Sequence, residues 1–200
     1  MIVKLVCAGA DSFRKLYTPD ENELLVGVDA GALSIIAAGY RPYLSIGDFD
    51  SGNLSEIARQ SDLLMIYPTR KDFGDLELAL QEIRTLKPEK VLVYNGTGGR
   101  LDHFIAALNL LVRYQDLNIE IIDERNSIML LKESAKIEKG KYKYLSLFAV
   151  EEDTVISLSG FKYNLDHYSL SRFDNLCLSN EIETRGEIKT NKKLLLVRAI

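Results

Sequence analysis

Short apolar runs alternate with segments of helical periodicity over residues 1–122 of the chain. Apolar runs of this length predict strands, and they lie near residues 2–8, 24–28, 43–47, 63–67, 90–94 and 118–122. Between them, apolar residues recur at steps of three and four, the spacing of a helix that packs on a sheet. Two such helices are indicated by Leu76, Ala79, Leu80, Ile83 and Leu86 and by Phe104, Ala107, Leu108 and Leu111. The alternation predicts βαβ units and a mostly parallel sheet.

The pattern changes near residue 123, where short β-like segments separated by charged or glycine-containing turns begin. Such segments predict an antiparallel sandwich, with strands near 127–132, 144–149, 154–158, 176–178, 185–190 and 193–198. We therefore expect the α/β fold class, with an N-terminal three-layer α/β domain over 1–123 and a C-terminal all-β sandwich over 124–200.

Composition and charge narrow the choice of partner. The 25 basic and 29 acidic side chains give a net charge of −4. The chain therefore lacks the positive charge that is typical of general nucleic-acid binding. A small-molecule partner fits better. No apolar run reaches the ~18 residues that span a bilayer, and the apolar N-terminus is too short for a secretion signal, so we expect no membrane partner and a cytoplasmic protein. Cys7 and Cys177 have neither disulfide nor zinc spacing, and both are expected to be buried thiols.

The segment Gly-Asp-Phe-Asp-Ser at 47–51 follows a predicted strand. On an extended backbone, Asp48 and Asp50 lie on one side and Phe49 turns away into packing. Two carboxylates on one side repel unless a cation joins them. Mg²⁺ in phosphotransfer sites is typically held by one or two carboxylates plus substrate phosphates and water, so the pair fits such an ion. An equally good interpretation is that Asp50 or Ser51 caps the next helix.

The segment at 71–75, Lys-Asp-Phe-Gly-Asp, has a good structural explanation. Asp72 could cap a helix that begins near Gly74, and Asp75 would lie in its first turn, where the helix dipole favours acids. Lys71 stands just before the cap and could reach a phosphate. By itself this segment favours structure over function.

The segment at 96–103, Gly-Thr-Gly-Gly-Arg-Leu-Asp-His, favours function. Three glycines permit a tight turn whose backbone N–H groups face an anion at a helix N-terminus. Arg100 adds a forked cation suited to phosphate, Asp102 is a candidate metal or hydroxyl partner, and His103 could hydrogen-bond nearby. The glycines match neither the Walker A pattern nor G-x-G-x-x-G.

A fourth strand-end turn lies at 28–31, where Gly31 opens a predicted helix. Asp29 could cap that helix or face a nucleotide, and spacing alone does not decide. Open α/β sheets bind ligands beyond the carboxyl ends of their strands. The acids of these turns can therefore converge on one crevice.

Taken together, the motifs resemble the thiamine pyrophosphokinase family. The match comprises Asp-x-Gly at 29–31, Gly-Asp-Phe-Asp-Ser at 47–51, Lys-Asp-x-x-Asp-x-Glu at 71–77 and Gly-Gly-Arg-x-Asp-His at 98–103. Segments 157–163 and 178–181 are similar to C-terminal motifs of the family. The resemblance implies transfer of pyrophosphate from ATP to the thiamine hydroxyl with release of AMP, a requirement for Mg²⁺, and homodimers with active sites at the subunit interface.

Position by position, the resemblance implies catalytic roles for Arg100 and for the acids of a Mg²⁺ site, Asp48, Asp50, Asp75 and Asp102. It implies phosphate contacts by Gly98, Gly99 and Arg100, with Asp72 beside the acidic site, and thiamine contacts by Ser179 and Asn180. Further candidates for ATP contacts at the same strand ends are Asp29, Gly31, Lys71 and Thr97. The base that takes the hydroxyl proton is one of the aspartates, or Asp102 assisted by His103. The chain departs from the family at Gly74, where threonine is usual.

Three other functions compete with this interpretation. The same chemistry could act on another heterocyclic alcohol, such as a hydroxymethyl-pterin. The acids could hold a magnesium nucleotide without chemistry, as in a regulatory module. The turns could also be only caps in a structural α/β protein.

Overall fold

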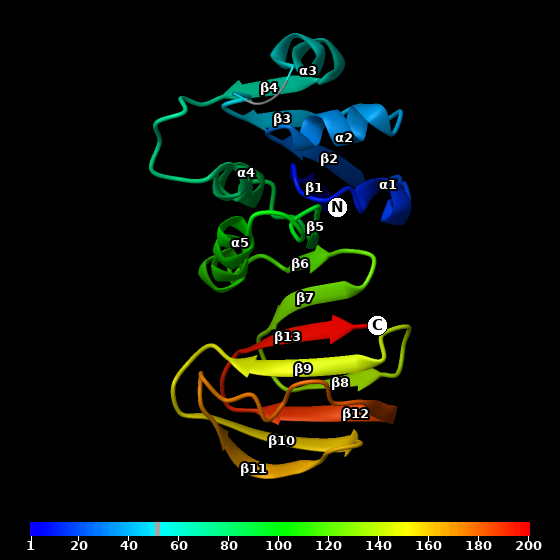
Figure 1. Ribbon diagram of the computed structural model, residues 1–200, viewed down its shortest axis with the longest axis vertical. Helices are drawn as coiled ribbons and strands as arrows, with labels where there is room; N and C mark the ends of the chain where they lie inside the picture. The colour runs from blue at the N-terminus through cyan, green and yellow to red at the C-terminus, as the bar shows by residue number, and fades with distance from the viewer. Residues whose placement is uncertain (51–52) are drawn as a thin grey trace. The chain divides into compact units, whose positions relative to one another are not determined.

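The computed structural model describes residues 1–50 and 53–200 (Figure 1). The chain divides into two compact units, residues 1–124 and residues 125–200.

The first unit is built on a parallel sheet with the strand order β4-β3-β2-β1-β5-β6 (Figure 1). Its strands are β1 (Ile2–Val6), β2 (Glu23–Val28), β3 (Leu44–Gly47), β4 (Leu63–Ile66), β5 (Lys90–Tyr94) and β6 (Ile119–Ile122). The order runs outward from β1 to β4 and then resumes on the other side of β1 with β5. The strand order thus reverses between β1 and β5, and open α/β sheets usually bind ligands beyond the strand ends near such a reversal.

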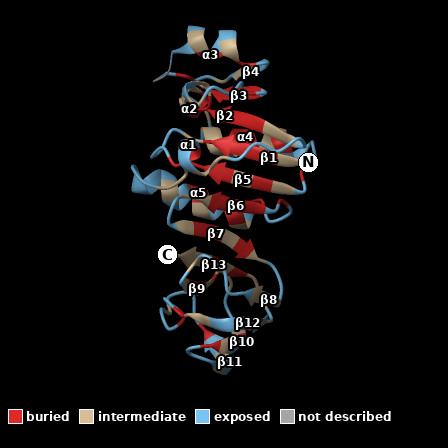
Figure 2. Ribbon diagram, turned by 90° about the vertical axis from the view of Figure 1, so that its right-hand side faces the viewer, coloured by how far each residue is buried: buried red, intermediate tan, exposed pale blue. Residues whose placement is uncertain are grey.

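Helices cover both faces of this sheet. The short helices α1 (Phe13–Leu16), α2 (Gly31–Ala37) and α3 (Leu54–Gln60) lie on one side, and α4 (Asp75–Arg84) and α5 (Leu101–Arg113) lie on the other (Figure 1). Strands covered on both faces are buried along their length, and Figure 2 shows this burial in β1, β2 and β3. The predicted three-layer architecture is confirmed.

The second unit, all of it described, is an antiparallel sandwich. One sheet has the order β7-β13-β9 and the other β11-β10-β12-β8. The strands are β7 (Asn126–Leu131), β8 (Ala135–Glu138), β9 (Tyr144–Ala149), β10 (Thr154–Phe161), β11 (Leu165–Leu170), β12 (Ile182–Thr190) and β13 (Leu194–Ala199). Apolar side chains of both sheets form one core, including Leu147, Ile156, Ile188 and Leu196. The predicted sandwich is confirmed.

Three details of the second unit differ from the prediction. Strands β8 and β11 were not predicted, because their sequences are short or polar. The predicted strand at 176–178 is wrong, since these residues form a turn. Cys177 points into the sandwich core while Leu176 and Leu178 are exposed, so a turn produces the alternation that suggested a strand.

Among the described residues, no helix is long and apolar enough to cross a membrane.

Candidate active site

Turns with unusual backbone follow three strands of the parallel sheet, the adjacent β2 and β3 and, beyond β1, β5. Asp29 after β2, Phe49 after β3 and Asn95 after β5 have φ values of 50°, 53° and 57°. The left-handed region is unfavourable for residues other than glycine, and such positions concentrate at functional sites. The strand ends at this edge of the sheet are therefore candidates for a site.

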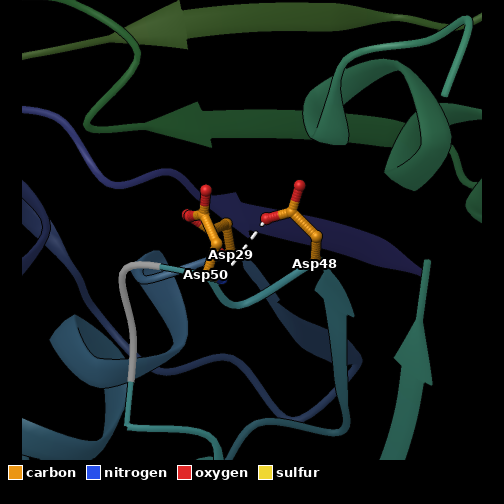
Figure 3. A group of neighbouring side chains, drawn as sticks. All are labelled: Asp29, Asp48 and Asp50. Atoms are coloured by element: carbon orange, nitrogen blue, oxygen red, sulfur yellow. Dashed lines mark hydrogen bonds between the residues drawn. The ribbon is translucent and has the colours of Figure 1, made fainter. Parts of the chain in front are cut away.

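The carboxylates of Asp29, Asp48 and Asp50 form an acidic group at these strand ends (Figure 3). Each offers an oxygen, and the three oxygens lie within 4.8 Å of one another. The Asp50 N–H donates a 3.4 Å hydrogen bond to Asp48 Oδ1. Carboxylate oxygens are ligands that Mg²⁺ prefers, so the donor set suits that ion. Asp29, a candidate helix cap or nucleotide contact from its position in the sequence, lies with the candidate metal ligands.

The loop that carries this group differs from its predicted form. Phe49 is buried against Ala32 and Ile57, as expected, but its backbone is left-handed rather than extended. Capping of α3 by Asp50 is wrong, because Asn53 is the N-cap and its side chain accepts the Glu56 N–H. Ser51 lies outside the described residues.

Lys71 links the acidic group to the start of α4. Its Nζ lies 2.8 Å from Asp48 Oδ2 and 2.8 Å from Asp75 Oδ1. The Lys71 and Asp48 side chains are only 11% and 12% exposed. The hydrogen bond from Lys71 holds the pKa of Asp48 below its ordinary value. Burial opposes the charge on Lys71, but the hydrogen bonds to Asp48 and Asp75 outweigh it and raise the pKa of Lys71.

The prediction that Asp72 caps α4 is wrong. Gly74 is the N-cap and makes no side-chain cap, while Asp72 is exposed. Asp75 lies in the first turn of α4, as expected. The helix start therefore leaves both Lys71 and Asp75 turned toward the acidic group rather than toward the helix backbone.

The glycine turn after β5 forms as predicted. Gly98 and Gly99 have φ values of 71° and 107°, and a Cβ on Gly98 would lie 3.0 Å from the Ala10 side chain. These positions therefore require glycine. The preceding Thr97 hydroxyl donates a 2.7 Å hydrogen bond to Asp123.

The two charged residues after this turn pair with each other. Arg100 is the N-cap residue of α5, and its guanidinium lies 2.6 Å from Asp102 Oδ2. Both side chains are exposed, and the hydrogen bond from Arg100 lowers the pKa of Asp102. Within the described residues, Asp102 does not join the acidic group of Asp29, Asp48 and Asp50. His103 is exposed beside it in the first turn of α5.

The loop between β1 and α1 was not predicted to take part in the site. Buried Asn95 fixes this loop, since its Oδ1 accepts the Ser12 N–H and the Phe13 N–H, each at 2.9 Å. The contact joins the loop after β1 to the loop after β5. The only sequence signals for a functional loop here were Gly9 and Ser12, and neither residue type is specific for such a loop. Gly31 has a steric role, because a Cβ there would lie 1.9 Å from the Val6 carbonyl oxygen.

In the second unit, the predicted thiamine residues have different environments. The Asn180 side chain is buried, donates to the Tyr163 carbonyl at 2.7 Å and accepts the Tyr163 N–H at 3.1 Å. It therefore holds a turn that presents the exposed Tyr163 ring. Ser179 is exposed with a φ of 56°, and its N–H donates to Ser146 Oγ.

Two protein-family descriptions match the chain. Residues 17–122 match "Thiamin pyrophosphokinase, catalytic domain", and residues 134–195 match "Thiamin pyrophosphokinase, vitamin B1 binding domain". A thiamine pyrophosphokinase of Bacillus subtilis is 36% identical over 190 residues, which cover 90% of this chain and 88% of the relative.

The chain belongs to the thiamine pyrophosphokinase family. The solved family structure from Bacillus subtilis has a TM-score of 0.89 and 30% identity, and the match covers 100% of this chain and 99% of that one. The structure from Geobacillus thermodenitrificans has a TM-score of 0.86 and 32% identity, with 100% and 98% coverage. The resemblance inferred from the motifs is confirmed, and so is the ATP-dependent transfer of pyrophosphate to thiamine that it implied.

Proposed function

We propose that this member of the family transfers pyrophosphate from ATP to thiamine at the strand ends that carry Asp29, Asp48 and Asp50. The observation that carries the proposal is the close grouping of their three carboxylates at the carboxyl ends of strands β2 and β3 of a doubly wound sheet. The products are thiamine diphosphate and AMP. The thiamine hydroxyl oxygen bonds to the β-phosphorus of ATP, its proton passes to an aspartate of the site, and the bond between that phosphorus and the oxygen retained by AMP breaks.

Different residues of the first unit would contact the metal ion and the phosphates of ATP. The Asp29, Asp48 and Asp50 carboxylates would hold Mg²⁺, with Asp75 joined to them through Lys71. Bound Mg²⁺ would neutralise charge on the phosphate oxygens. The N–H groups of Gly98 and Gly99 would face the phosphates, and Arg100 would exchange its exposed pairing with Asp102 for phosphate oxygens. Such transfer depends on positioning and charge neutralisation, so no protein nucleophile is needed.

We also propose the remaining features that the family resemblance implies. Asp72 and Thr97 contact ATP, and Asp102 completes the acidic site. Ser179 and Asn180 belong to the thiamine site, Ser179 by direct contact and Asn180 by holding the neighbouring turn. The active protein is a cytoplasmic homodimer with active sites at the subunit interface.

The test is an assay of the purified chain with thiamine, ATP and Mg²⁺ that follows thiamine diphosphate and AMP together. We expect AMP in equal amount to the ester, with no reaction after chelation of the metal. A hydroxymethyl-pterin serves as the alternative acceptor. Release of ADP, or turnover of the pterin and not of thiamine, would refute the proposal.

A further inference from the structure

The environment of Lys71 differs from that of an ordinary surface lysine. Its ammonium group lies at 2.8 Å from carboxylates of two separate segments, Asp48 after β3 and Asp75 at the start of α4. The side chain is mostly buried, whereas the ion pair of Lys15 with Glu124 is well exposed on both sides. An exposed ion pair contributes little to stability. The buried contacts of Lys71 therefore fix its position more strongly than the exposed pair fixes Lys15.

Asp48 is shared between two roles. One of its oxygens pairs with Lys71, and the residue also belongs to the acidic group with Asp29 and Asp50. Together, the carboxylates of Asp29, Asp48, Asp50 and Asp75 and the ammonium group of Lys71 carry a formal net charge of −3. This excess attracts a further cation, but that cation must approach the same carboxylate that Lys71 already contacts.

We propose that Lys71 is a competing counter-ion that couples metal binding to nucleotide binding at this site. Lys71 and a divalent cation compete for Asp48 and Asp75, so the metal alone binds weakly. A triphosphate gives the ammonium group another partner, and the metal then takes the carboxylates. The inference rests on the proposed function, because it requires the metal and ATP to share this site.

Lysine suits such an exchange. Its charge is compact and sits on a flexible four-carbon stem, unlike the rigid fork of arginine. Repulsion between an ammonium group and a divalent ion a few ångströms apart is worth more than a factor of ten in affinity even at the effective dielectric constant of a protein surface. Because coupling is reciprocal, the nucleotide must strengthen metal binding by the same factor by which the metal strengthens nucleotide binding.

The test measures Mn²⁺ binding to the full chain, without nucleotide, from the electron paramagnetic resonance signal of the free ion. We expect Lys71→Gln to bind Mn²⁺ about 10- to 100-fold more tightly than wild type. Lys71→Arg keeps the charge and Lys15→Gln removes an exposed one, so both should stay near wild type. A gain of affinity cannot result from a damaged fold. Equal or weaker binding by Lys71→Gln would overturn the inference.

A second measurement uses the wild-type chain and does not depend on the stability of Lys71→Gln. The side-chain ammonium signal of Lys71, assigned by its loss in Lys71→Arg, is followed by NMR during addition of Mg²⁺ with a non-hydrolysable ATP analogue. We expect this signal to shift while that of Lys15 does not. An unchanged Lys71 signal at saturation would overturn the inference.

The outcomes separate this inference from the proposed function. Wild type that forms thiamine diphosphate and AMP, with equal Mn²⁺ affinity in Lys71→Gln, overturns only the role of Lys71. Absence of Mn²⁺ binding in both wild type and Lys71→Gln overturns the inference together with the proposed metal site.

Discussion

Replacement of Asn95 by alanine should destabilise the first unit and loosen the loop between β1 and α1. Asn95 Oδ1 accepts hydrogen bonds from the Ser12 N–H, the Ser12 hydroxyl and the Phe13 N–H. Asn95 is buried and has a left-handed backbone, which asparagine tolerates better than alanine. The substitution therefore removes three contacts and adds backbone strain.

The magnitude follows from these contacts. Each hydrogen bond contributes a net 0.5–1.5 kcal/mol, so three contribute about 3 kcal/mol. The left-handed conformation costs alanine about 1 kcal/mol more. We expect a loss of about 4 kcal/mol in the free energy of unfolding, or about 15 °C in the melting temperature of the unit.

The assay is urea and thermal unfolding followed by far-UV circular dichroism, because the chain has no tryptophan. Asn118→Ala is the matched control, since its exposed amide makes one 3.4 Å hydrogen bond to the Glu89 carbonyl. The KM for ATP should also rise, because the loosened loop follows β1 at the point where the strand order reverses, the usual place for a ligand in such sheets. A loss of stability no larger than that of Asn118→Ala would refute the role of Asn95.

Three further predictions concern the site, the core and the thiols. Asp48→Asn should lower kcat by about 10²–10³ with an unchanged dichroism spectrum, and normal turnover would contradict its proposed role. Lys4→Met leaves the buried Glu23 carboxylate without its ion pair, so urea unfolding should show a loss of about 3–5 kcal/mol; a loss below 1 kcal/mol would mean that the pair is dispensable. Cys177 is buried as expected, whereas Cys7 is only partly buried. Burial of the sulfur atoms raises the pKa of Cys7 to about 12 and that of Cys177 to about 11. At pH 8, iodoacetamide followed by mass spectrometry should modify both thiols only in the unfolded chain, and rapid labelling of the native chain would contradict this. Because each thiol has a higher pKa in the folded chain, burial of the neutral thiol favours the folded state at pH values below the unfolded pKa of about 8.5. This contribution to stability is lost as the pH rises through the pKa of the folded chain.

The fold was predictable where strands are buried on both faces, because such strands are continuous apolar runs in the sequence. Strands β1 to β6 are mostly covered by helices, so they appear as apolar runs in the expected order. The two missed strands, β8 and β11, are the two edges of one sheet in the sandwich. An edge strand pairs on one side only and carries polar residues against further pairing, as in Lys136 or Asp166 and His167. Hydrophobic pattern alone does not distinguish such a strand from a loop.

The candidate site was predictable in its acids and glycines but not in its contacts. Capping preference alone does not reveal which of several nearby polar residues caps a helix. Asn53 and Gly74 occupy the cap positions for which Asp50 and Asp72 were candidates. The pairing of Lys71 with Asp48 joins residues that are 23 positions apart in the sequence. Such a contact depends on the packing of β3 and α4, so no local pattern records it.

Phe49 explains why Asp48 and Asp50 lie together as predicted, although the backbone conformation predicted for 48–50 is wrong. An extended backbone at 48–50 was expected to bring both carboxylates to one side, yet the chain turns left-handed at Phe49. A bulky residue in that region costs about 1–3 kcal/mol. Burial of the Phe49 ring against Ala32 and Ile57 contributes about 1.5–3 kcal/mol and offsets this cost. The grouping of Asp48 and Asp50 with Asp29 is thus maintained by an aromatic residue of the core, which ties the acidic group to the packing of α2 and α3.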